Sequence, residues 1–179
     1  MSKRKNHALD VVSIRLVKDA PLLSEHPINS PDDAVKLLGQ YLCEMDREVF
    51  CIINLKTNQV PINCSIISVG SLNESLAHPR EILKTSILSN ADKIIMLHNH
   101  PSGTLTPSSF DTKMTDRMMQ LCDMIGIPLI DHIIVGGDNN QYFSFKAKDI
   151  LQHSQIHLED NYKNLNFDTT RVAESGRGR

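Results

Sequence analysis

Two histidines separated by one residue, His98 and His100, follow a short apolar stretch, and an acid, Asp111, comes eleven residues after the second histidine. The stretch at 93–97 is typical of a buried β-strand. Side chains two residues apart on a strand point to the same face, so both imidazoles can hold one ion. Two imidazoles and one carboxylate suit zinc with a fourth position left open, which is the pattern of catalytic rather than structural zinc sites.

The residues between His100 and Asp111 predict a turn followed by a helix, which brings the acid back toward the two histidines. Pro-Ser-Gly at 101–103 breaks the strand and turns the chain. Thr106 or Ser108 is expected to cap a helix that has Pro107 in its first turn. Asp111 lies one turn from Ser108 on that helix. A His-x-His pair alone is often coincidental, but the added turn and Ser-x-x-Asp sequence make coincidence a poor explanation.

The sequence His-Asn-His-Pro-Ser-Gly at 98–103, followed by Thr-Pro-Ser at 106–108 and by Asp111, resembles the JAMM motif of MPN-domain metalloproteases. Within that group the chain is most similar to the bacterial RadC family, also called JAB-domain DNA repair proteins. Further segments that resemble the core of that family lie at 70–73, 78–81, 90–91 and 131–136. The resemblance therefore covers approximately residues 30–151.

The JAMM pattern also requires a glutamate at the start of an earlier strand. Glu48 fits this position because it leads directly into an apolar, β-branched run at 49–55. Glu44 and Asp46 are rival acids, but they lie in the preceding polar connection. Without the motif downstream, Glu48 is more simply explained as a solvated acid at a strand end.

The resemblance implies a zinc-dependent hydrolase that cleaves a peptide or isopeptide amide. With one zinc ion held by His98, His100 and Asp111, one coordination position remains for water. Glu48 is expected to act as the general base and to pass the proton to the leaving amine. Ser108 is expected to stabilise the developing oxyanion. It can instead serve only as a helix cap, and both roles can coexist.

Two other histidines are expected to support the site or the fold rather than to bind the metal. His78 precedes Pro79 and fits the start of a helix. His132 follows Asp131 and can orient a neighbouring side chain. Asn99, between the two ligands, is expected to face the opposite side of the strand.

Two further classes of function remain open. One is a non-catalytic scaffold or interaction module of the MPN type, and the intact set of Glu48, His98, His100 and Asp111 argues against it. The other is a non-haem iron oxygenase, because two histidines and one carboxylate also form the facial triad of those enzymes. A hydrolase needs Glu48 and an oxygenase does not, which favours the hydrolase.

The order of predicted elements indicates an α/β (α+β) fold. That order predicts a mixed sheet sandwiched by helices. The resemblance implies that this is an MPN/JAB-like domain, with a layout similar to cytidine deaminases and the zinc at the sheet edge. Strands are expected at 10–17, 48–55, 60–69, 93–97, 127–135 and 141–145. Helices are expected from Ser30, from His78, from Thr106 or Ser108 to Gly126, and at 147–151. Residues 1–29 form an arm with that possible edge strand, 30–151 the domain, and 152–179 a mostly disordered tail.

The composition limits the classes of partner. A chain of 179 residues with 40% apolar and 4% aromatic residues supports one domain with an aliphatic core. The net charge of −2 and the isoelectric point near 6.4 argue against a general nucleic-acid coat protein. About 30 residues precede the first helix. They leave no room for the helix-hairpin-helix region of RadC proteins, so direct DNA binding is expected to be weak or absent.

No apolar run is long enough to span a membrane, and no signal peptide is recognisable, so the protein is expected to be cytoplasmic. Four cysteines without a Cys-x-x-Cys pair are expected to be small buried hydrophobic residues. They are Cys43, Cys51, Cys64 and Cys122. The sequence singles out no particular protein or peptide substrate and no oligomeric state.

Overall fold

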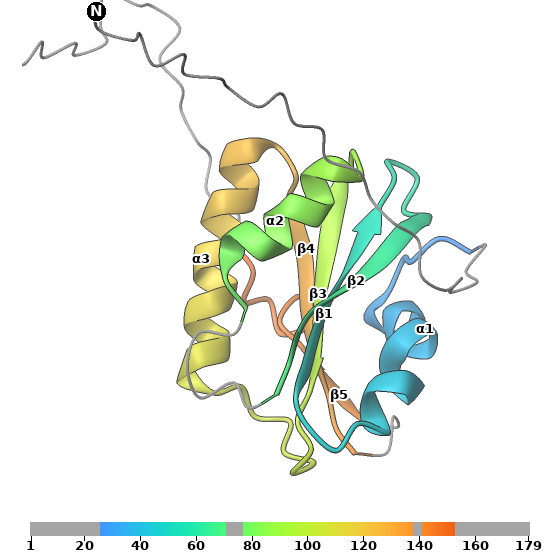
Figure 1. The fold of residues 1–179 in the computed structure, drawn as a ribbon, viewed down its shortest axis with the longest axis vertical. Helices are drawn as coiled ribbons and strands as arrows, with labels where there is room; N and C mark the ends of the chain where they lie inside the picture. The colour runs from blue at the N-terminus through green and yellow to red at the C-terminus, as the bar shows by residue number, and fades with distance from the viewer. Residues whose placement is uncertain (1–25, 71–76, 138–140, 153–179) are drawn as a thin grey trace, which may run out of the picture.

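Five strands form one mixed sheet in the order β2-β1-β3-β4-β5 (Figure 1). A computed structural model of the chain describes residues 26–70, 77–137 and 141–152, so the expected edge strand at 10–17 and most of the expected tail lie outside it. The strands are β1 (Val49–Leu55), β2 (Pro61–Val69), β3 (Lys93–Asn99), β4 (Leu129–Val135) and β5 (Tyr142–Ser144). Only β3 and β4 pair in parallel, and the other neighbouring strands are antiparallel.

Helices cover both faces of the sheet. The first helix, α1 (Pro31–Cys43), lies on one face, and α2 (Pro79–Leu88) and α3 (Ser109–Ile125) lie on the other (Figure 1). Parallel strands need a crossover connection, and α3 supplies it between β3 and β4. This arrangement confirms the expected mixed sheet between layers of helices.

The central strands are apolar on both faces because both faces are covered. All seven residues of β1 are buried. Alternate residues of β1, β3 and β4 pack toward α1, as Ile53, Leu97 and Ile133 do. The residues between them, such as Ile52 and Met96, pack toward α2 and α3. The two periodic faces fix which side chains of β3 can meet those of α3.

Within the described residues, one expected element is absent from the structure. The short helix expected at 147–151 is wrong, because the chain there makes a single turn. Asp149 adopts a left-handed conformation with φ of 56°, and the Ile150 amide donates to the Phe145 carbonyl at 3.0 Å, a pattern that ends a helical turn. As expected, the predicted ligands lie at the edge of the sheet where β3 ends and α3 begins, and β3 is the middle strand.

The cysteines and the surface agree with a domain that has its own core. All four cysteines are free thiols, of which Cys51 and Cys122 are buried.

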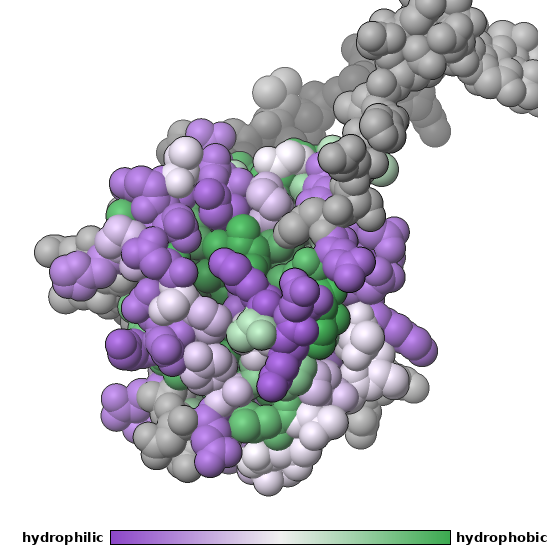
Figure 2. Space-filling view, turned by 180° about the vertical axis from the view of Figure 1, so that it is seen from behind, coloured by the Kyte–Doolittle hydropathy of each residue, from purple (hydrophilic) through white to green (hydrophobic). Residues whose placement is uncertain are grey.

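Within the described ranges, no helix is both long and apolar enough to cross a membrane. The face seen from behind is mostly hydrophilic, with apolar side chains in smaller patches between polar ones (Figure 2).

Candidate metal centre

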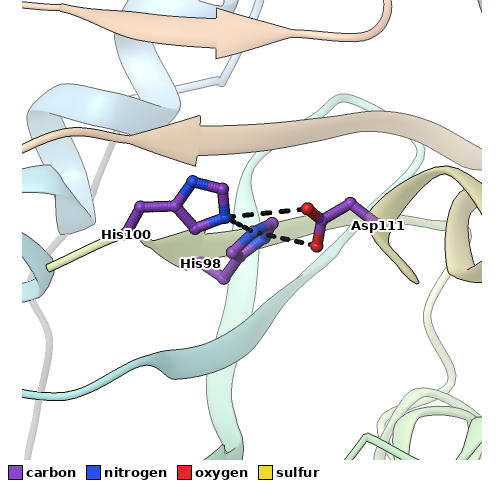
Figure 3. A group of neighbouring side chains, drawn as sticks. All are labelled: His98, His100 and Asp111. Atoms are coloured by element: carbon purple, nitrogen blue, oxygen red, sulfur yellow. Dashed lines mark hydrogen bonds and ion pairs between the residues drawn. The ribbon is translucent and has the colours of Figure 1, made fainter. Parts of the chain in front are cut away.

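Three side chains that can bind a metal converge where β3 ends and α3 begins. His98 Nε2 lies 3.1 Å from His100 Nε2 and 3.2 Å from Asp111 Oδ1, and His100 Nε2 lies 3.6 Å from Asp111 Oδ2 (Figure 3). The exposed fractions are 0% for His98, 9% for His100 and 2% for Asp111. The structure therefore brings the three predicted ligands together in a nearly enclosed position. His100 is the most accessible of them.

The strand and the helix position these groups by simple local rules. His98 is paired with Phe50 of β1 and with Ile134 of β4, so its backbone is fixed on both sides. The amide of His100 donates to the Val135 carbonyl at 3.1 Å and continues this pairing one step beyond β3. Both rings then project to the face covered by α3, because the two residues are two positions apart.

Ser108 places the carboxylate of Asp111. The hydroxyl of Ser108 accepts from the Asp111 amide at 3.1 Å and donates to Asp111 Oδ2 at 2.7 Å, and the Ser108 amide donates to the same oxygen at 2.7 Å. This reciprocal pattern is a capping box, which satisfies amides at the start of α3. Ser108 is therefore a helix cap in this structure, and the cap leaves Oδ1 of Asp111 facing His98.

The spacing of the three groups is close to that of ligands around zinc. Nitrogen and oxygen ligands at about 2.0–2.2 Å from a tetrahedral zinc ion lie about 3.3–3.6 Å from one another. His98 Nε2 lies 3.1 Å from His100 Nε2 and 3.2 Å from Asp111 Oδ1, which is close to this spacing, whereas His100 Nε2 faces the other carboxylate oxygen, Oδ2, at 3.6 Å. Among the described residues, His98, His100 and Asp111 form the group that could hold an ion. The donor set therefore fits zinc.

The electrostatics show an electron-rich site that attracts a cation or a proton. Burial acts to raise the pKa of Asp111, but the interactions with the His100 and His98 imidazoles and with Ser108 overcome it and hold that pKa far below its usual range. The hydrogen bond to Asp111 raises the pKa of His100 against the opposing effect of burial. The carboxylate is thus ionised at neutral pH, and the site holds a negative charge that a metal can neutralise.

Glu48 lies on the same face of the sheet as the two histidines. It precedes β1 by one residue and Phe50 by two, and Phe50 is paired with His98. Its negative charge contributes to raising the pKa of His100. Glu48 is half-buried and stands outside the group of three possible ligands. Such a position suits a group that acts next to the metal rather than on it.

The backbone around Glu48 is held from two directions. The side chain of Asn99, on the opposite face of β3, accepts from the Val49 amide at 2.8 Å and donates to the Arg47 carbonyl at 3.1 Å. The Gly70 amide donates to the Glu48 carbonyl at 2.9 Å. Asn99 therefore links the strand that carries the histidines to both neighbours of Glu48.

The two remaining histidines differ in their relation to the site. His78 caps α2, since its Nδ1 accepts from the Arg80 amide at 3.2 Å. His132 is fully buried in β4, with Nε2 at 3.0 Å from His98 Nδ1. It contacts the side of the His98 ring that faces away from Asp111, and it is not one of the three residues that could hold an ion.

Sequence reasoning missed two groups that contact the histidines. The Thr104 carbonyl lies 2.6 Å from His100 Nδ1, and the Thr115 hydroxyl lies 2.6 Å from His132 Nδ1. Thr115 is four residues after Asp111 and therefore on the same face of α3, which is a signal that the sequence does carry. A main-chain carbonyl such as that of Thr104 leaves no such signal.

Comparison with known proteins places most of the chain in one family. A family model described as a RadC-like JAB domain matches residues 28–150. A UPF0758 protein of Desulfitobacterium hafniense is 44% identical over 137 residues, which cover 76% of this chain and 59% of that protein. UPF0758 proteins of Clostridium perfringens and Alkaliphilus metalliredigens are 43% and 39% identical over 129 residues, covering 72% of this chain and 56% and 55% of theirs. The chain thus spans less than two thirds of the length of these relatives.

Proposed function

The chain belongs to the RadC-like JAB domain family, and from that premise we propose that it is a zinc-dependent hydrolase that cleaves a peptide or isopeptide amide. The observation that carries the proposal is the convergence of His98, His100 and Asp111, with Glu48 on the same face beside them. Zinc bound to these ligands would supply an activated water and polarise the scissile carbonyl. The remaining steps belong to side chains of this chain.

Glu48 takes the role of general base in this proposal. Its carboxylate accepts a proton from the attacking water and donates it to the leaving amine, so that one group serves both halves of the reaction. Its half-buried position next to the ligands, rather than among them, supports this role. The same position disfavours a non-haem iron oxygenase, which needs no such base.

Ser108 is assigned to the oxyanion. Its hydroxyl donates to Asp111 Oδ2 at 2.7 Å and can turn toward the carbonyl oxygen as negative charge develops there. The capping interaction with the Asp111 amide uses the oxygen rather than the proton of the hydroxyl, so the cap persists during the turn. Ser108 thereby serves both the helix and the reaction.

The first prediction concerns Glu48→Gln, which is expected to retain zinc and lose hydrolysis, because an amide cannot accept the proton. The substrates are a synthetic peptide and a peptide with an isopeptide bond at a lysine Nζ. Glu44→Gln, which changes an exposed acid four residues earlier, is the control and should keep full turnover. Unchanged turnover in Glu48→Gln would place the base elsewhere, and zinc loss as large as in His100→Ala would make Glu48 a ligand. No cleavage by the zinc-loaded wild type would favour a scaffold.

The second prediction is that this chain binds DNA only weakly, because its net charge is −2 and the phosphate backbone demands positive charge. A titration at physiological salt should give an affinity no better than the ~10⁻⁴ to 10⁻⁶ M of non-specific contacts. Nanomolar binding would contradict this. Any link to DNA repair then runs through a protein substrate or partner.

We also place the protein in the cytoplasm, where free thiols such as its four cysteines persist.

A further inference from the structure

A continuous chain of hydrogen bonds runs behind the metal centre from His98 to the backbone of Asp111. His98 Nδ1 lies 3.0 Å from His132 Nε2, His132 Nδ1 lies 2.6 Å from Thr115 Oγ1, and Thr115 Oγ1 lies 2.7 Å from the Asp111 carbonyl oxygen. His98 and His132 are fully buried and Thr115 is only 3% exposed. The two ends of this series of hydrogen bonds are His98 and Asp111, which the proposed function makes metal ligands.

The Asp111 carbonyl, at the end of this series of hydrogen bonds, fixes the direction of every bond in the series. A backbone carbonyl can only accept, so the single hydroxyl proton of Thr115 goes to the Asp111 oxygen. The Thr115 oxygen must then accept from His132 Nδ1–H. A fully buried imidazole whose two nitrogens face the His98 ring and the Thr115 hydroxyl stays neutral, because a buried unpaired charge is costly. His132 therefore has one proton, on Nδ1, and its Nε2 accepts from His98 Nδ1–H.

The consequence for His98 is a fixed tautomer. With its proton on Nδ1, His98 carries the lone pair on Nε2, the atom that faces His100 and Asp111. His100 reaches the same state by another route, because its Nδ1 lies 2.6 Å from the Thr104 carbonyl, which also only accepts. Both rings thus direct lone pairs into the same space.

We propose that His132 and Thr115 are positioning residues that lock His98 in the tautomer able to bind a metal and connect it to the helix turn carrying Asp111. This inference rests on the proposed metal site but not on the proposed hydrolysis. Hydrogen-bonded partners behind a ligating histidine set its orientation and tautomer, and their loss typically lowers metal affinity about 10–100-fold. The ring of His132 is itself held by stacking on Phe145, with centroids 5.1 Å apart and planes 7° apart.

The test compares three variants of α3. Thr115→Val removes the hydroxyl at nearly constant shape, so His132 loses the acceptor that fixes its proton, and zinc affinity should fall about 10-fold or more. Thr115→Ser restores the hydroxyl and should recover the affinity. Thr112→Val is the matched control and should leave affinity unchanged, because the Thr112 hydroxyl donates to a helix carbonyl, that of Ser108 at 3.1 Å, and touches no histidine. Affinities are measured by competition with a chromogenic chelator.

A second readout needs neither zinc nor substrate. Imidazole ¹⁵N shifts of the metal-free protein at mildly alkaline pH should show the Nδ1-protonated tautomer for His98 and His132, and Thr115→Val should abolish this preference at both. An Nε2-protonated His98 in the wild type would overturn the proposal, as would equal zinc affinities for Thr115→Val and Thr115→Ser. Failure of the wild type to bind zinc would instead remove the proposed function, and the tautomers would still decide the role of His132 and Thr115.

Discussion

His98 and His100 lie two residues apart on one strand, yet different groups support their rings. The support of His100 is the main-chain carbonyl of Thr104, which any residue at that position would supply. The support of His98 is the side chain of His132, which in turn depends on Thr115. Side-chain substitutions at position 132 or 115 can therefore remove the hydrogen bonds that support His98. The support of His100 is a backbone carbonyl, so it does not depend on which side chain is present.

A third prediction, also at the level of single residues, concerns pH. A metal must displace the proton of His100, whose pKa is raised mainly by its hydrogen bond to Asp111. Apparent zinc affinity should be constant above that raised pKa and fall about tenfold per pH unit below it. Because the ordinary histidine pKa is about 6.5, the fall should begin above that pH. Chelator competition across this range measures it, and an affinity that stays constant to well below pH ~6 would contradict it.

In the metal-free protein the same group stabilises the fold with the opposite dependence on pH. The folded-state pKa of His100 is raised, so its contribution is fully present below the unfolded pKa and is lost as pH rises through the folded one. Protonation of His100 and binding of zinc are therefore alternative ways of neutralising the same carboxylate, each dominant in its own pH range.

Single residues of the site were predictable where the signal is local. Strand alternation places His98 and His100 on one face, and the helix start places Asp111 within reach of them. The contact between His98 and His132 spans 34 residues and depends on the parallel pairing of β3 with β4. No local pattern encodes that register, so sequence reasoning could give His132 a supporting role without naming its partner.

At the level of elements, the N-terminus of α3 combines a helix cap with Asp111, the proposed carboxylate ligand. The capping box of Ser108 and Asp111 has a counterpart in α1, where the Ser30 hydroxyl donates to Asp33 Oδ2 at 2.9 Å and accepts from the Asp33 amide at 3.3 Å. Among the described contacts, the α1 cap serves only to satisfy backbone amides at the start of its helix. Comparing the caps of α1 and α3 therefore distinguishes the contribution of a cap to stability from the contribution of Ser108 to the site.

This comparison gives a fourth prediction. Ser108→Ala and Ser30→Ala should each lower the free energy of unfolding by about 0.5–2 kcal/mol, because each removes one N-cap. Only Ser108→Ala should also lower kcat, by about 10²-fold or more if the hydroxyl serves the oxyanion. Denaturant titration and hydrolysis assays measure the two effects. Equal activity in the two variants would restrict Ser108 to the role of a cap.

Among the described residues, the helix expected at 147–151 is the element predicted wrongly, and it shows where local patterns fail. The sequence at 147–151 contains residues that permit a helix, but Asp131 of β4 captures this segment from a distance. Its carboxylate accepts from the Lys146 amide at 3.0 Å and from the Ser144 hydroxyl at 2.7 Å. These hydrogen bonds hold the chain in a turn directly after β5, and they connect residues too far apart for periodicity to reveal.

At the scale of the whole molecule, the site is assembled from separate layers of the fold. Glu48 directly precedes β1, His98 lies in β3 and His100 directly follows it, His132 comes from β4, and Asp111 comes from α3. These positions are brought together only when the sheet and α3 pack against each other (Figure 1). Sequence reasoning predicted the layers correctly because apolar periodicity is strong in the central strands.

The most direct test of the account is the zinc content of the intact chain, measured by native mass spectrometry after removal of metal and reconstitution with zinc. We predict one zinc per wild-type chain and none on His98→Ala, with far-ultraviolet circular dichroism showing that both remain folded. His78→Ala, which alters a histidine that caps α2, should bind zinc like the wild type. A wild-type chain that takes up no zinc, or a His98→Ala variant that binds it equally well, would contradict the assignment of His98, His100 and Asp111 as a metal centre.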